Sequence, residues 1–77
     1  LKNVIFAAIF IEDKKQKIIK ISFRSAGSFS VNEFARKHFN GGGHINAAGG
    51  RSEMSLKDTV KEFRELLKKY EEELKAS

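Results

Sequence analysis

The chain has 77 residues, which suits one small domain, and it contains no cysteine, so neither a disulfide framework nor a thiolate metal site stabilises it. Its 15 basic and 10 acidic residues give a net charge of +5. The longest apolar run, Val4–Ile11, is shorter than the roughly 20 residues that cross a membrane, so we expect no membrane partner. The missing cysteines agree with a cytoplasmic protein, and a first residue of Leu1 rather than Met indicates a piece of a longer protein.

Two strands are predicted in the first third of the chain. Val4–Ile11 is continuously apolar and rich in β-branched and aromatic residues, which predicts a strand buried on both faces of a covered sheet. Lys17–Arg24 alternates between apolar and polar residues, which predicts a strand with one covered face. The short polar stretch Glu12–Gln16 between them favours an antiparallel hairpin.

The first helix is predicted by a capping box and by apolar spacing. Ser30 with Glu33 three residues later is typical of a helix start. Asn40 and Gly41 end the helix, and we assign its left-handed terminal conformation to Gly41. Apolar face positions recur at helical spacing: Val31, Phe34, Ala35, His38 and Phe39.

A second helix follows a short strand predicted at Ala48–Glu53. Ser55 followed by Asp58 indicates its start, and its length is about 20 residues. Its apolar face is predicted at Leu56, Val60, Phe63, Leu67, Tyr70 and Leu74. The whole pattern predicts an α/β fold, a small mixed sheet with a hairpin, a short third strand and two flanking helices.

Glycine and positive charge coincide in the middle of the chain. Five of the six glycines lie within Gly41–Gly50, and residues 17–51 carry six basic residues against Glu33 alone. Glycine lets a backbone approach a ligand and turn its N–H groups toward an anion, so a phosphate-bearing partner is favoured over a flexible linker. The spacing matches neither a dinucleotide fingerprint nor a Walker loop.

The two histidines have different predicted roles. His44 directly follows three glycines, where it could bind a phosphate oxygen, act as a general acid or cap a loop carbonyl. His38 lies on the apolar helix face, which favours a partly buried, hydrogen-bonded side chain. With only these two imidazoles and no carboxylate between them, we expect no metal site and no cofactor in this chain.

Taken together, the motifs resemble the DHH-associated domain of DHH-type phosphoesterases. They are Phe23-Arg24-Ser25, then Gly27–Asn32, then Asn40–His44, then Ala47–Gly50. The resemblance covers residues 1–77 almost completely and is greatest to the bacterial oligoribonuclease and pAp phosphatase group.

The resemblance implies the C-terminal, substrate-binding lobe of a two-lobed, manganese-dependent hydrolase of short oligoribonucleotides and pAp. In that family two manganese ions are held by an N-terminal DHH domain, which this sequence lacks, so we expect this chain alone to be inactive. The implied partners are short RNA or nucleotide phosphate and that DHH domain in cis. The family also implies substrate contacts by Arg24, Ser25, Gly41, Gly42, Gly43, His44 and Asn46, with His44 as the catalytic residue.

Three alternatives stay open at this point. One is the equivalent lobe of a cyclic-dinucleotide phosphodiesterase, and another is the related tRNA-binding domain of alanyl-tRNA synthetases. The third is a domain that forms a homodimer. His44 directly after Gly43 favours the phosphoesterases over the tRNA-binding relatives.

Overall fold

The computed structural model describes residues 5–71, which form four strands and two helices. The elements in chain order are β1 (Ile5–Asp13), β2 (Ile18–Ala26), α1 (Val31–His38), β3 (Gly42–His44), β4 (Ala47–Ser52) and α2 (Leu56–Lys69). No helix within these residues is long and apolar enough to span a membrane.

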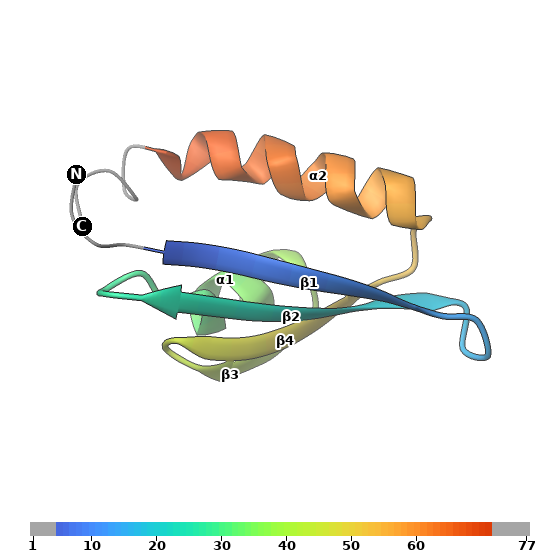
Figure 1. Ribbon diagram of the computed structural model, residues 1–77, viewed down its shortest axis with the longest axis horizontal. Coiled ribbons are helices and arrows are strands. Elements are labelled where there is room, and N and C mark those ends of the chain that lie inside the picture. Colours follow the sequence, from blue (N-terminus) through green and yellow to red (C-terminus); the bar gives the residue numbers. More distant parts are fainter. Residues whose placement is uncertain (1–4, 72–77) are drawn as a thin grey trace.

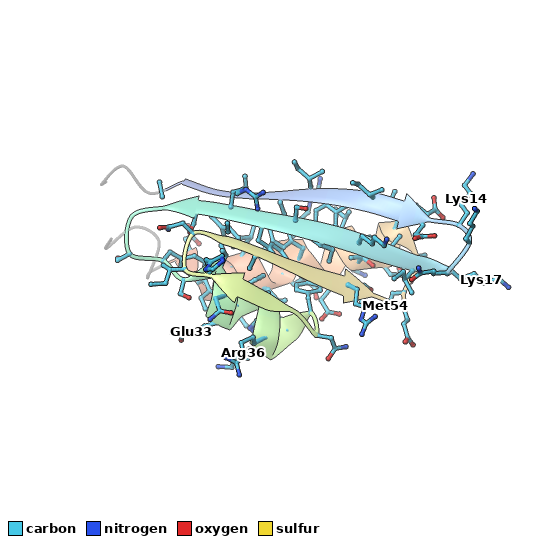
Figure 2. The ribbon with its side chains drawn as sticks, turned by 90° about the horizontal axis from the view of Figure 1, so that it is seen from below. Lys14, Lys17, Glu33, Arg36 and Met54 are labelled. Carbon is cyan, nitrogen blue, oxygen red and sulfur yellow. The ribbon has the colours of Figure 1, made fainter. Side chains whose placement is uncertain are left out.

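The strands form a single antiparallel sheet in the order β1-β2-β4-β3. The expected hairpin joins β1 to β2, and its turn contains Lys17 with a φ of 58°. Both helices pack on the same face: α2 runs alongside β1, and α1 crosses β3 and β4 (Figure 1). Figure 2 looks onto the opposite face, with the helices behind the sheet. The α/β class is therefore confirmed, but the sheet is antiparallel throughout rather than mixed, and it has one strand more than predicted.

An aromatic cluster forms the core between the sheet and the helices. Phe23 is fully buried at the centre of β2, and its ring lies 5.4 Å from that of Phe34 and 5.6 Å from that of Phe39. Phe63 of α2 stacks on the same ring at 6.1 Å. The buried apolar residues are Ile19, Ile21, Phe23, Phe29, Val31, Phe34, Ala35, Phe39, Ala48, Phe63 and Leu66.

The predicted helix starts are both present. The Ser30 hydroxyl accepts a hydrogen bond from Glu33 N at 3.2 Å, and the Ser55 hydroxyl accepts one from Asp58 N at 3.1 Å. At the end of α1, however, the left-handed residue is Asn40, with a φ of 50°, and not Gly41 as predicted. Asparagine is the residue after glycine that best tolerates this conformation.

The buried face of α2 is rotated from the predicted one. Thr59, Phe63 and Leu66 are buried, whereas Leu56 is 40% exposed. Thr59 lies inward because its hydroxyl donates a hydrogen bond to the buried Ser52 hydroxyl at 2.8 Å. The last predicted face position, Leu74, lies outside the described residues.

The prediction that β1 is buried on both faces is wrong for this chain. Phe6, Ala8 and Phe10 point toward the core, but Ile9 and Ile11 are 60% and 57% exposed. Both helices cover the same face of the sheet, so the other side of the apolar run has no layer over it within residues 5–71.

Candidate functional site

The open face of the sheet brings two of the predicted site residues into one row. Arg24 of β2 lies opposite Ala47 of β4, and Ala47 lies opposite His44 of β3. Directly opposite residues of antiparallel strands project on the same face, and the next row, Phe23 with Ala48, is buried in the core. Arg24 and His44 therefore both project from the uncovered face, two strand spacings or about 10 Å apart.

Both side chains of this row are accessible to a ligand. Arg24 and His44 are exposed, and between them lies only the methyl group of Ala47. Among residues 5–71, Arg24 makes one side-chain hydrogen bond, from Nη1 to the neighbouring Phe23 carbonyl, at 3.1 Å. Glu33 and Arg36 lie on α1, away from this face (Figure 2). A guanidinium fork and an imidazole on one open row can bind a phosphate group.

Hydrogen bonds of Ser25 and Asn46 connect the end of β2, which carries Arg24, to the turn that follows His44. The Ser25 hydroxyl donates to the Phe29 carbonyl at 2.8 Å and accepts from Asn46 Nδ2 at 2.9 Å. Asn46 Nδ2 also donates to the Gly27 carbonyl at 3.2 Å. These bonds use the polar groups that were predicted to contact substrate, so in this structure both residues position the loops beside Arg24 and His44.

The turn between β3 and β4 is fixed by its backbone. The Ile45 carbonyl accepts from Val31 N, the first residue of α1, at 2.8 Å, and the Asn46 carbonyl accepts from Ser25 N at 3.0 Å. Since His44 immediately precedes this turn, these bonds fix its position relative to β2. Val31 was predicted only as a core residue, and nothing local in the sequence indicates this second role.

The glycine segment Gly41–Gly50 contains β3 and the first part of β4, whereas the sequence predicted a strand only from Ala48 onward. A Cβ on Gly41 would overlap the Gly49 carbonyl oxygen, and one on Gly43 would lie 2.7 Å from the Ala47 carbonyl oxygen. The close approach of β3 to β4 thus requires these two glycines. Direct contact of Gly41, Gly42 and Gly43 with a phosphate stays a prediction.

The N–H groups of this segment are partly used within the protein. Gly41 N donates to the Ala35 carbonyl at 3.1 Å, and Gly43 N donates to Asn32 Oδ1 at 2.9 Å. The segment is therefore not a row of unpaired donors. Asn32 joins α1 to β3 here, and sequence reasoning missed it because its partner is a backbone group far along the chain.

His38 lies in a different part of the molecule from His44. Its Nε2 is hydrogen-bonded to the Tyr70 hydroxyl at 2.8 Å, where α1 meets the end of α2. Burial lowers the pKa of His38 below 6.5, as do the nearby charges of Lys37 and Lys69, while Glu62 acts in the opposite direction. His38 is thus the partly buried, hydrogen-bonded side chain that its face position predicted.

The described residues do not fit a manganese site. Within residues 5–71, no group of three or more histidine, aspartate or glutamate side chains is arranged to hold a metal ion. The two ions implied by the sequence resemblance would need ligands from another domain.

Comparisons with known proteins identify a domain family and a similar fold. The family model of the DHHA1 domain matches residues 1–76. The fold is similar to the crystal structure of an exopolyphosphatase-related protein from Bacteroides fragilis, with a TM-score of 0.83 and 44% sequence identity. That match covers 91% of this chain but only 20% of the Bacteroides chain. No curated protein matches the sequence.

Proposed function

The chain belongs to the DHHA1 domain family, and from this premise we propose that it binds the substrate of a phosphoesterase that hydrolyses short oligoribonucleotides and pAp. The family and the exopolyphosphatase-related neighbour support a role associated with phosphoester hydrolysis. We propose short RNA and pAp as the substrates because of the sequence resemblance and because of the side chains at the site.

The observation that carries the proposal is the shared row of Arg24 and His44 on the open face. Arg24 is always charged and offers a planar fork of donors that suits phosphate oxygens. His44 can donate a hydrogen bond to the same phosphate or to the next one along a nucleotide. Side chains of this length, about 10 Å apart at the backbone, can bind one nucleotide between them.

The role of this chain in the reaction is to bind and orient the substrate. Two manganese ions in a DHH domain of the same polypeptide would supply the activated water. Arg24 holds the phosphate in position, and His44 stabilises charge on a phosphoryl oxygen or donates its proton to the leaving group. Ser25 and Asn46 keep the two donors in place through the hydrogen bonds described above.

A titration of the chain with pAp, followed by NMR, tests the proposal. We expect shifts at the amides and side chains of Arg24 and His44. Arg24→Gln and His44→Ala should each weaken binding about tenfold or more, because each removes a hydrogen bond to a charged group. Lys57→Gln on the exposed side of α2 is the matched control and should leave the affinity unchanged.

Equal affinity of wild type and Arg24→Gln for pAp would overturn the proposal. A clear preference for a cyclic dinucleotide over pAp would favour the cyclic-dinucleotide alternative. Each protein should first be shown to be folded by its dispersed amide spectrum, so that a lost fold is not read as a lost contact.

A further inference from the structure

We propose a second phosphate site on the open face, formed by Lys20 and Arg51, that binds an oligonucleotide extending beyond the nucleotide at Arg24 and His44. This inference rests on the proposed function, because it takes the first site as the anchor of the same ligand. It concerns residues to which neither the sequence motifs nor the first site assign a role.

Two cations lie directly opposite each other on neighbouring strands at this place. Lys20 of β2 pairs with Arg51 of β4, and both side chains are exposed on the uncovered face. Like charges directly opposite in an antiparallel pair are destabilising. Within residues 5–71, Arg51 makes no side-chain hydrogen bond or ion pair. A bound anion would remove this repulsion and supply a partner for Arg51.

The two cations border a shallow hollow of about 330 Å³. Four glycines are among its lining residues, which are Gln16, Ile18, Lys20, Asn40, Gly41–Gly42, Gly49–Gly50 and Arg51. Because these four glycines carry no side chain, an anion can come close to the strands between the two positive charges. The hollow therefore has the shape and the charge that a phosphate group requires.

Gly49 is a glycine of the hollow that packing does not require. A Cβ at this position would meet only the Ile21 carbonyl oxygen, at 3.5 Å, which is an ordinary contact. Glycine inside a strand costs roughly 0.5–1 kcal/mol relative to alanine. Since the fold does not need glycine here, close approach of a ligand explains its presence better than packing does.

The distance between the two sites determines the kind of ligand. The row of Lys20 and the row of Arg24 are four residues apart along β2, which corresponds to about 13 Å. Stacked nucleotides rise by about 3.4 Å each, so the span takes about four nucleotides when the bases are stacked and fewer when the chain is extended. A mononucleotide such as pAp cannot occupy both sites, whereas a tetranucleotide can.

One carboxylate competes with the ligand for Lys20. Asp13 Oδ2 lies 3.2 Å from Lys20 Nζ, and the side chain of Lys20 is still 55% exposed. The Asp13 side chain is less open, at 19% exposed, but the pair still lies at the surface, where ion pairs are weak, so phosphate can compete with it. Removing the carboxylate should therefore strengthen binding at this site.

The test compares pAp with a 5′-phosphorylated tetraribonucleotide, each titrated against the full chain by fluorescence anisotropy. Lys20→Gln with Arg51→Gln should weaken the tetranucleotide about tenfold and leave pAp unchanged. The slope of log affinity against log salt for the tetranucleotide should become shallower by about 0.7, which corresponds to the loss of one phosphate contact. Asp13→Asn should tighten the tetranucleotide alone, and Lys57→Gln with Arg64→Gln on α2 is the charge-matched control.

The outcomes separate this inference from the proposed function. If the Lys20 and Arg51 double variant binds the tetranucleotide like wild type, or if the α2 control weakens it equally, the second site is overturned. If Arg24→Gln leaves both ligands unaffected while the double variant weakens the tetranucleotide, the proposed function is overturned, and only phosphate binding by Lys20 and Arg51, without the anchor, is supported. A folded chain that binds neither ligand overturns both.

Discussion

At the scale of single residues, the glycines of β3 and β4 have different roles. A Cβ on Gly43 would lie 2.7 Å from the Ala47 carbonyl oxygen and 2.8 Å from Ala48 Cα, so Gly43→Ala should lower the free energy of unfolding by about 1–3 kcal/mol. The same substitution at Gly49 meets no such atoms and should raise it by about 0.4–1 kcal/mol, because alanine restricts the unfolded chain. Urea unfolding of both variants measures the two signs.

A destabilised Gly49→Ala variant would contradict the argument that packing does not need this glycine. The second proposed site adds a further expectation. The stabilised Gly49→Ala variant should bind a tetranucleotide more weakly than wild type, because its methyl group adds to the lining of the hollow. More stability with less binding is the signature of a residue kept for a ligand.

At the scale of elements, the contact between α1 and α2 depends on pH through His38. The unfolded chain takes up a proton as the pH falls through 6.5, while the folded chain, with its lowered pKa, does so only at a lower pH. The contribution is therefore complete above pH 6.5 and decreases as the pH falls toward the folded pKa. Urea unfolding at pH 7.5 and 5.5 should show a larger loss of stability for wild type than for His38→Gln, which keeps His44. Identical losses in the two proteins would exclude His38 as the cause.

At the scale of the whole molecule, the sequence predicted features that depend on neighbouring residues better than features that depend on contacts between distant segments. The capping residues Ser30 and Ser55 correctly predicted both helix starts, because a cap bonds to its own neighbours in the chain. The exposure of Ile9 and Ile11 could not be predicted, since a continuous apolar run looks the same whether one face or both are covered. Strand β3 was missed because a run of glycines has no side-chain alternation to reveal a strand.

The sequence predicted Arg24 and His44 as site residues, but it did not predict that they lie in one row on the same face of the sheet. The sequence motifs identified both side chains, yet their shared face depends on the register of β2 with β4 and of β4 with β3. A shift by one residue would turn either side chain into the core. The pairing of Lys20 with Arg51 depends on the same register, which explains why the sequence alone showed them only as part of a basic segment.

The strand order β1-β2-β4-β3 also has a consequence for how the chain acquires its function. The β1–β2 hairpin can form early from neighbouring segments, whereas β4 reaches β2 only after a long loop containing α1 and β3 has closed. A folding intermediate with only the first hairpin would present Arg24 and Lys20 without His44 or Arg51. Full affinity for the nucleotide would then arise only at the last step of sheet assembly. Tight nucleotide binding would therefore indicate that the sheet has formed completely.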